Sequence, residues 1–399
     1  MSDPQESPGG APGDPSALLL ERALEAAGEG IVIADARRPD IPLIYVNAAF
    51  EKVTGYSRAD ALGRNCRFLQ GALTDPAALG EIRRALAERR GVVVELLNYR
   101  ADGTPFWNRL SITPVFDSAG EVTHFIGVQS DVTERRLAEE RLAAANRQMR
   151  RDLLAAARIQ KSLLPEQTPS VAGVEVAWAF RPCQELAGDM LNVFRLDDDR
   201  LAFFILDVSG HGVPAALLSF TLAHTLTATP GSCLLQRRGD GWAATGPAQV
   251  AAQLNRRFPL DPVAPQYFTL FYALLTPSTG EVRLVSAGHP LAIVSPREGA
   301  PWRLVATGPP IGLSEGAQYA ERVLRLEVGD RLVVFTDGLP EALSPTGDEL
   351  GFERVLQTVQ TYRDEELRAL VDKLAEDGVR WAQGAPQDDI SVAAFERSR

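Results

Sequence analysis

The stretch from residue 132 to residue 164 contains neither glycine nor proline and ends just before Pro165. It is rich in alanine, leucine, arginine and glutamate, which have high intrinsic helix propensity. A segment of this length that is stopped by a proline predicts one long helix. This helix separates a region before it from a region after it, so the chain is expected to form two globular domains joined by a helical linker.

Seven residues of this linker recur with alternating spacings of four and three. They are Leu142, Asn146, Met149, Leu153, Ala156, Gln160 and Leu163. Such spacing is typical of the seam of a short coiled coil, here with polar interruptions, and predicts a parallel homodimer. The alternative is a helix that lies on one of the neighbouring domains, because the run barely reaches the roughly three to four heptads that a coiled coil requires.

The region over 17–131 alternates short strand-like runs with short helical stretches, which predicts a compact α+β domain. The runs fall at 31–35, 41–47, 92–100, 105–117 and 124–132. Residues 1–16 are rich in proline, glycine, serine and aspartate, so a disordered lead-in is expected there.

The region over 165–399 has more strands than helices. Strand-like runs fall at 174–180, 201–208, 267–276, 281–288, 331–338 and 390–395, and helical stretches at 215–226, 248–258 and 365–378. Because the strands come largely as neighbours, antiparallel sheets covered by helices fit better than a doubly wound parallel sheet. The expected fold class is therefore a multidomain α+β protein.

Composition narrows the classes of function. The chain has 399 residues, of which 45% are hydrophobic, and it carries a formal net charge of −11. That charge disfavours nucleic acid and anionic membranes as partners. Three cysteines, no apolar run near the ~18 residues of a membrane span and an acidic start predict a cytosolic protein.

Cys66 stands in an unusually polar string, Gly63-Arg-Asn-Cys-Arg-Phe-Leu-Gln-Gly71. Taken alone, a cysteine is more often a buried packing residue. The whole string, however, resembles the flavin-binding signature of light-oxygen-voltage (LOV) domains, a branch of the PAS fold. Three amides on expected strands, Asn98, Asn108 and Gln129, also match that family.

This resemblance implies FMN as cofactor and a role for each matching residue. Asn98 and Asn108 would hydrogen-bond the polar edge of the flavin, and Gln129 would bond its far side and report a change in its protonation. Cys66 would add covalently to flavin carbon 4a under blue light. The phosphate would be held by the residues Arg67 and Arg83, helped by Gln70 and Asn65. A flavin that acts as a redox or constitutive sensor is the alternative.

In the second region, aspartates stand where apolar runs end and turns begin. They are Asp189, Asp207, Asp337 and the adjacent pair Asp388 and Asp389. Each Asp-Gly or Gly-Asp pair alone is ordinary turn chemistry. Carboxylates gathered from separate strands would repel one another unless cations neutralised them. The set of aspartates therefore predicts bound Mg²⁺ or Mn²⁺, which prefer oxygen ligands.

The order and flanks of these aspartates, with Ser286-Ala-Gly-His-Pro290, resemble bacterial metal-dependent Ser/Thr phosphatases of the PPM type, in the branch that controls sporulation and stress sigma factors. The resemblance covers roughly 157–399 and implies a helix-flanked β-sandwich with two metals. A water shared by the metals would attack phosphorus. Asp207 would bridge the metals beside the Val208 carbonyl. The other ligands would be Asp189, Asp337 and Asp388, with Asp389 as the alternative to Asp388.

Three features depart from that family. Asn192 stands where the family usually has an acidic residue. His211 has an altered offset from Asp207, so a turn histidine is the simpler interpretation. No basic pair marks a site for the substrate phosphate, and Arg181 is the one candidate for that role. Cys183 and Cys233 are interpreted as packing or surface residues.

Together these motifs predict a blue-light-regulated Ser/Thr phosphatase that acts on a phosphorylated regulatory protein, an anti-anti-sigma factor by analogy. The alternative from another class is a light-sensing binding protein whose phosphatase-like module is inactive, for which Asn192 is the best support.

Overall fold

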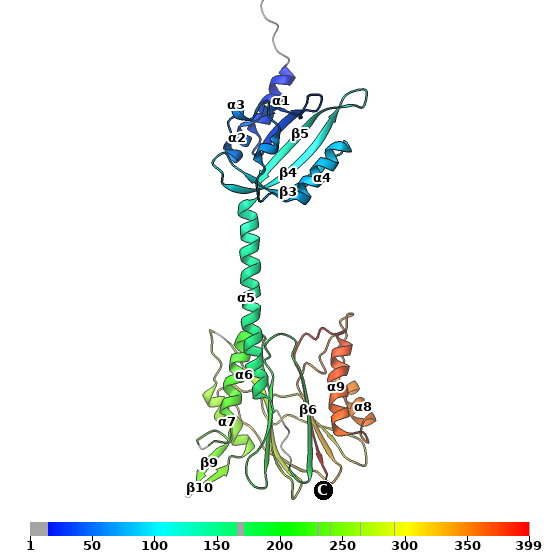
Figure 1. Cartoon of the computed structure of the whole chain (residues 1–399). Helices are drawn as coiled ribbons and strands as arrows, with labels where there is room; N and C mark the ends of the chain where they lie inside the picture. The colour runs from blue at the N-terminus through cyan, green and yellow to red at the C-terminus, as the bar shows by residue number, and fades with distance from the viewer. Residues whose placement is uncertain are drawn as a thin grey trace, which may run out of the picture. The chain divides into compact units, whose positions relative to one another are not determined.

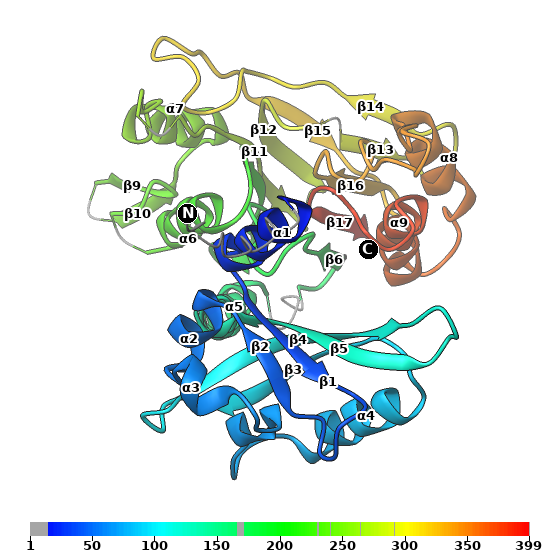
Figure 2. The ribbon, with the colours of Figure 1, turned by 90° about the horizontal axis from the view of Figure 1, so that it is seen from above.

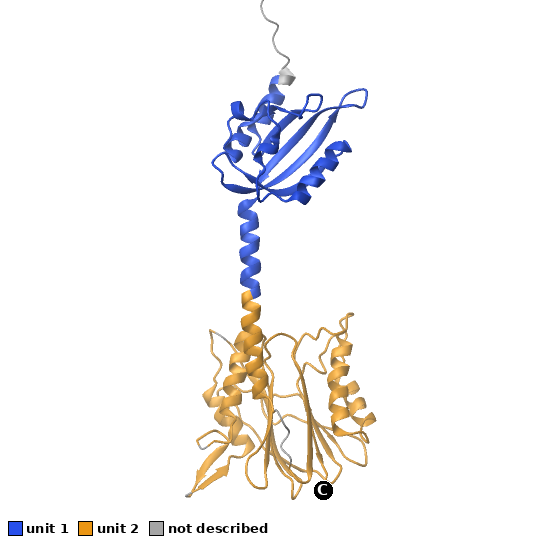
Figure 3. Cartoon of the chain, in the orientation of Figure 1, with its two compact units in different colours: residues 1–147 blue, residues 148–399 orange. Residues whose placement is uncertain are grey.

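The computed structural model describes residues 15–165, 171–229, 231–239, 241–263, 265–290 and 292–398. The chain divides into two compact units, residues 1–147 and 148–399 (Figure 3). Of the expected disordered lead-in over 1–16, residues 1–14 lie outside the described residues, and helix α1 (Pro15–Ala26) begins directly after them.

Unit 1 (Figure 1) is built on an antiparallel sheet with the strand order β2-β1-β5-β4-β3, and its five strands are labelled in Figure 2. The strands are β1 (Gly30–Asp35), β2 (Leu43–Val46), β3 (Val92–Tyr99), β4 (Pro105–Phe116) and β5 (Val122–Asp131). Between β2 and β3 come α2 (Ala48–Thr54), α3 (Arg58–Ala61), the 3₁₀ helix η1 (Cys66–Leu69) and α4 (Pro76–Ala87). Alternate residues of β3 are buried, and they pack against α4 through Ile82 and Ala85.

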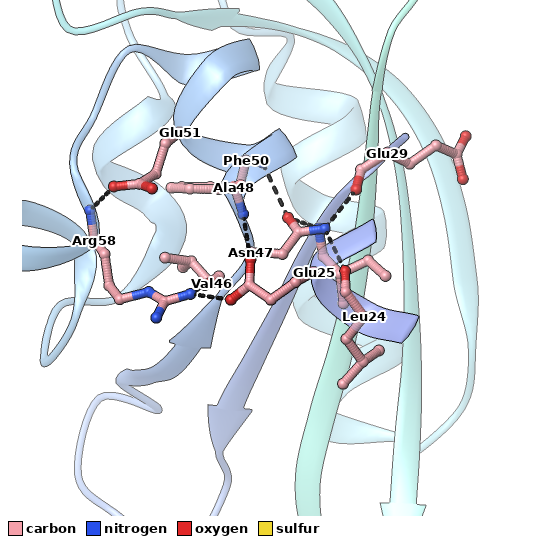
Figure 4. A network of polar contacts seen from close by, with 10 residues as sticks. Leu24, Glu25, Glu29, Val46, Asn47, Ala48, Phe50, Glu51 and Arg58 are labelled. Atoms are coloured by element: carbon pink, nitrogen blue, oxygen red, sulfur yellow. Dashed lines mark hydrogen bonds and ion pairs between the residues drawn. The ribbon is translucent and has the colours of Figure 1, made fainter. Parts of the chain in front are cut away.

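Asn47 attaches helix α1 to this sheet (Figure 4). Its buried amide makes four hydrogen bonds to backbone groups, accepting from Ile31 (2.8 Å) and Phe50 (3.0 Å) and donating to Leu24 (2.9 Å) and Glu29 (3.0 Å). Glu25 of α1 adds an ion pair with Arg58. A buried amide without hydrogen-bond partners is energetically costly, so these four bonds stabilise this one arrangement of α1 on the sheet.

The predicted linker is the helix α5 (Thr133–Leu163), which has 31 residues. Its first part belongs to unit 1 and its part from Gln148 on belongs to unit 2. Charged residues recur along its whole length, and among the described residues no helix has both the length and the apolar character needed to cross a membrane.

The two ends of the predicted seam differ in exposure. Leu142 and Met149 are 63% and 60% exposed, whereas Gln160 is buried in unit 2 and Leu153 and Ala156 are half-buried. The C-terminal part of α5 therefore lies on unit 2, as the alternative prediction stated. The part around Asn146 leaves its apolar positions open.

Unit 2 is a sandwich of two antiparallel sheets, which confirms the predicted fold class. One sheet has the order β15-β12-β11-β8-β7, with β7 (Met190–Arg195), β8 (Leu201–Val208), β11 (Phe268–Thr276), β12 (Glu281–Ala287) and β15 (Arg322–Arg325). The other has the order β14-β13-β16-β17-β6, with β6 (Val174–Arg181), β13 (Ala292–Ser295), β14 (Trp302–Leu304), β16 (Arg331–Phe335) and β17 (Ile390–Arg397). A separate hairpin consists of β9 (Leu235–Arg238) and β10 (Gly241–Ala244).

The core lies between the two sheets. Phe203 of β8 meets Phe395 of β17 edge to face, with ring centroids 4.6 Å apart. Helices α6 (Val213–Thr225) and α7 (Pro247–Arg257) cover the outer face of the first sheet. Helices α8 (Phe352–Thr361) and α9 (Leu367–Trp381) lie side by side on the outer face of the second (Figure 2).

Several elements were not predicted from the sequence. They are α1, α8 and the short strands β7, β9, β10, β13, β14 and β15. The strands of three or four residues among them are too short to display a clear alternating pattern, and the six residues of β7, Met-Leu-Asn-Val-Phe-Arg, do not alternate. Helix α8 follows Gly351 and has no side-chain cap.

Candidate functional site

Unit 1 encloses a cavity between its sheet and the helices that follow β2. Its lining combines aliphatic side chains with a few polar ones: Val32, Ala34, Ile41, Leu43, Asn65, Cys66, Arg67, Leu69, Gln70, Ile82, Leu86, Leu96, Asn98, Asn108, Leu110, Ile112, Phe125, Gly127 and Gln129. Of the residues predicted to hold a flavin, only Arg83 is missing from this lining, and it is exposed on α4. An apolar cavity with few polar groups is typical of a cofactor site.

Three amides share the sheet face that looks into the cavity, because strand side chains alternate between faces. The Asn108 Nδ2 donates to Asn98 Oδ1 (2.8 Å) and to Gln129 Oε1 (3.1 Å). All three side chains are buried, and Asn108 Oδ1 has no hydrogen-bond partner. A buried acceptor without a partner is unfavourable. This atom therefore suits a ligand that brings an N–H donor, such as the polar edge of a flavin.

Cys66 opens helix η1, whose N-cap Asn65 accepts a hydrogen bond from the backbone of Arg67. The Cys66 Sγ accepts a hydrogen bond from Gln129 Nε2 at 3.3 Å. Burial raises the pKa of the Cys66 thiol to about 11, and the bond from Gln129 acts in the opposite direction. The sulfur is therefore held as a neutral thiol in contact with the amide group of the cavity.

The mouth of the cavity carries a charged pair between Arg67 and Asp40. Asp40 and Ile41 both have positive φ angles, 65° and 46°, which is strained for a β-branched residue. Asn65 holds this turn by donating to the carbonyl oxygens of Asp40 (2.6 Å) and Ile41 (3.3 Å). Arg67 is a guanidinium at the solvent edge, where the phosphate of FMN would lie. The residues therefore fit FMN, with the ring inside and the phosphate outside.

In unit 2, the chain topology gathers the predicted aspartates at one edge of the sandwich. Asp207 is in β8, Asp189 precedes β7, Asp337 follows β16 and Asp388 precedes β17. β7 is paired with β8, and β16 with β17, so each antiparallel pair brings one strand start next to one strand end.

Two glycines allow the loops to approach. A Cβ on Gly188 would lie 2.9 Å from the Val208 carbonyl oxygen, and one on Gly338 would lie 2.1 Å from the Asp389 carbonyl oxygen. Only glycine avoids these contacts, which gives the Gly-Asp and Asp-Gly motifs a packing reason. The predicted Val208 carbonyl therefore stands beside the loop that carries Asp189.

The carboxylates perturb one another. Burial, and then the charges of Asp337 and Asp388, raise the pKa of Asp207 to about 8. Burial and the charge of Asp388 raise the pKa of Asp337 to about 6. Burial, followed by the charge of Asp207, raises the pKa of Asp189 well above its ordinary value. Such mutual repulsion favours a bound cation, and an all-oxygen donor set suits Mg²⁺ or Mn²⁺.

Asp388 and Asp389 differ in their surroundings. Asp389 is buried and accepts hydrogen bonds from the backbone of Cys183 and of Gly188, both at 2.8 Å. Asp388 is exposed and accepts from the backbone of Asp389. The geometry therefore favours Asp388 as the ligand and gives Asp389 a positioning role. Asp189 is itself oriented by the hydroxyl of Thr336 (2.8 Å), which sequence reasoning missed.

The remaining predicted residues have separate surroundings. His211 is exposed, and its Nδ1 lies 3.4 Å from Gln184 Nε2. Burial raises the pKa of Asp388, and the charge of His211 acts in the opposite direction. Asn192 bonds the backbone of Val193 (2.8 Å), and Arg181 ends β6. Glu341, which sequence reasoning missed, borders a pocket with Asp337, and burial followed by the charge of Glu349 raises its pKa.

Two cysteines of unit 2 were interpreted alike but differ in the structure. Cys233 is a buried packing residue, as predicted. Cys183 is not a plain packing residue, because its sulfur lies beside the carboxylates of Asp388 and Asp389. The two segments are more than two hundred residues apart in sequence, so no local pattern could indicate this contact.

The fold and these two sites define a sensor domain of the PAS class joined to a phosphatase-type sandwich. The family model for stage II sporulation protein E matches residues 197–398, half of the chain, and a PAS domain model matches residues 28–134. The chain therefore belongs to the stage II sporulation protein E family, and it joins a LOV-type PAS domain to a SpoIIE-type phosphatase domain.

Known relatives match part of the chain. The blue-light-activated histidine kinase 1 of Erythrobacter litoralis is 44% identical over 140 residues, which are 35% of this chain and 38% of the relative. Phototropin-2 of Oryza sativa subsp. japonica is 48% identical over 115 residues, 29% of this chain and 13% of the relative. A solved LOV domain of an Erythrobacter litoralis blue-light activated histidine kinase is 47% identical, with a TM-score of 0.26, and covers 26% of this chain and 96% of that domain. The chain thus spans well under half the length of these two relatives.

Proposed function

We propose that this chain is a blue-light-regulated protein serine/threonine phosphatase, with FMN in unit 1 and two Mn²⁺ or Mg²⁺ ions in unit 2. The names of the LOV-containing relatives and the family of unit 2 support the two halves of this proposal. The observation that carries it is helix α5, which contacts the sheet behind the cavity at one end and the loop of an aspartate ligand at the other.

On the sensor side, FMN supplies the absorption of blue light and the electrophile for a thiol. Cys66 presents that thiol, and Gln129, which bonds it, reports the change to its strand. Gln129 lies two residues before the end of β5, and α5 starts at Thr133, whose backbone donates to Asp131 (2.9 Å). A rearranged Gln129 therefore acts on the start of the helix.

The start of α5 is also fixed to the outer side of the sheet. Arg136 stacks on the ring of Trp107 at 4.0 Å and pairs with Glu95 (3.0 Å). Trp107 is the neighbour of Asn108 on β4, so the same strand bears a cavity amide on one face and a contact to α5 on the other. Light can change the activity only if some contacts differ between the dark state and the illuminated state, and the contacts of α5 with β3 and β4 can supply that difference.

On the output side, Gln160 connects α5 to the catalytic loop. It donates to the Ala187 carbonyl (2.8 Å), accepts from the Ala187 backbone (3.1 Å) and lies 3.3 Å from Ser219. Ala187 is two residues before Asp189. A shift or rotation of α5 would therefore displace the backbone that positions a metal ligand.

At the catalytic edge, the bound cations supply Lewis acidity that activates water and neutralises phosphoryl oxygens. Asp207, Asp337, Asp388 and Asp189 hold them, with the Val208 carbonyl, and Asp389 and Thr336 fix two of these carboxylates. The substrate is a phosphoserine or phosphothreonine on a regulatory protein, an anti-anti-sigma factor. A parallel homodimer through the open positions Leu142, Asn146 and Met149 is part of this proposal.

The test measures Mn²⁺-dependent phosphate release from a phosphorylated anti-anti-sigma protein in darkness and under blue light. Gln160→Leu should change the light-to-dark ratio, whereas Gln148→Leu, at an exposed position that donates to Asp152 of the same helix, should not. Flavin photochemistry without phosphate release from any phosphoester would favour the alternative, a light-sensing scaffold with an inactive module.

A further inference from the structure

Cys183 lies in the loop that joins β6 to β7. The last residue of β6, Arg181, is paired with Ile390 at the start of β17 in antiparallel register. Continuing this register for two residues sets Cys183 opposite Asp388. The juxtaposition of a thiol and the exposed metal-binding carboxylate therefore follows from the strand pairing of the sandwich.

Three potential ligand atoms meet at this place. The Cys183 sulfur and one carboxylate oxygen each of Asp388 and Asp389 all lie within 4.8 Å of one another. The backbone N–H of Cys183 donates to Asp389 (2.8 Å), which ties the loop to the acidic pair. Cys183 is half-buried and Asp388 is exposed, so an ion can enter from the solvent side.

We propose that Cys183, Asp388 and Asp389 form a site for a thiophilic divalent cation such as Zn²⁺ or Cd²⁺. Thiolates select soft cations, whereas the neighbouring all-oxygen set suits Mn²⁺ and Mg²⁺. On binding, the S–H bond breaks, a sulfur–metal bond forms and the proton passes to water, with no change in oxidation state. The remaining positions around the ion are filled by water.

The site shares Asp388 with the carboxylate centre. A cation held by Cys183 draws that carboxylate away from the catalytic ions, so its occupancy inhibits hydrolysis. This consequence rests on the proposed phosphatase function, but the binding of the cation does not.

Binding is tested first, on the full chain kept reduced. Cd²⁺ is titrated while the ultraviolet thiolate-to-cadmium absorption is recorded for the wild type, Cys183→Ser and, as a matched thiol control, Cys66→Ala. We expect a band that saturates near one equivalent, is lost in Cys183→Ser and persists in Cys66→Ala. A band that is absent from the wild type or unchanged in Cys183→Ser overturns the proposal.

Inhibition is tested next, with Mn²⁺ in excess and Zn²⁺ added. Each variant is compared with its own rate without Zn²⁺. Because one of three ligands is lost, we expect the inhibitory Zn²⁺ concentration to rise by about tenfold or more in Cys183→Ser. Equal sensitivity of the two proteins overturns the inhibitory role. If no variant releases phosphate, the proposed function fails, and the absorption titration still decides whether the cation site exists.

Discussion

The substitution Asp207→Asn is expected to stabilise the metal-free protein while it abolishes metal-dependent hydrolysis. In the folded chain, burial and the charges of Asp337 and Asp388 raise the pKa of Asp207 from 3.8 to about 8. A group whose pKa is raised on folding contributes stability at low pH that is lost as the pH rises toward the folded value. Without cations, ionisation of Asp207 therefore weakens unit 2 between about pH 4 and pH 8.

The magnitude follows from the shift. Each pKa unit corresponds to about 1.4 kcal/mol, and at pH 7 the carboxyl is ionised in the unfolded chain but still mostly protonated in the folded one. The free energy of unfolding at pH 7 is therefore lower by about 4 kcal/mol than at acid pH. For a domain of this size that is a change in Tm of about 10 °C. An asparagine carries no charge and avoids this loss.

The assay is thermal unfolding in EDTA at pH 5 and pH 7, followed by the same measurement with Mn²⁺. The wild type should lose stability from pH 5 to pH 7 in EDTA and regain it with Mn²⁺, because the ion binds the folded state alone. Asp207→Asn should be the more stable protein in EDTA at pH 7 and gain little from Mn²⁺. A wild-type Tm that does not fall with pH in EDTA, or an Asp207→Asn protein less stable than the wild type there, would refute the reasoning.

Three further outcomes are expected. Cys66→Ala should retain bound flavin, because the amides and apolar lining remain, but lose the reversible light-induced bleaching measured by absorption; parent-like bleaching would contradict the role of the thiol. Asp337→Asn should abolish Mn²⁺-dependent phosphate release with little change in circular dichroism, and parent-like turnover would exclude it as a ligand. A seven-residue insertion near Asn146 should preserve light regulation, because it keeps the heptad register of α5. An insertion of three or four residues changes that register and should shift or abolish light regulation. Equal light-to-dark ratios for all insertions, or a monomer by light scattering, would argue against a dimeric seam.

Much of both sites was predictable because their signals are local. The string around Cys66 and the Asp-Gly pairs are contiguous motifs, and η1 begins at Cys66 itself. The packing reason for Gly338, which is the close approach of the Asp389 backbone from a distant segment, is visible only in the fold. The alternation that places Asn98 and Asn108 on one face is a property of strands as such. The absence of glycine and proline likewise predicted α5 to within one residue at each end.

What the sequence determined by itself was thus the set of chemical groups and the elements that bear them, since helices, turns and strand alternation depend on near neighbours. Only the tertiary structure decided which groups meet. The pairing of β6 with β17 set Cys183 against Asp388, and the packing of α5 buried Gln160 against Ala187. It also gave Asp389 two backbone donors while Asp388 stayed open to solvent. These contacts join segments far apart in the chain, and their energies arise from burial and register that no short stretch of sequence encodes.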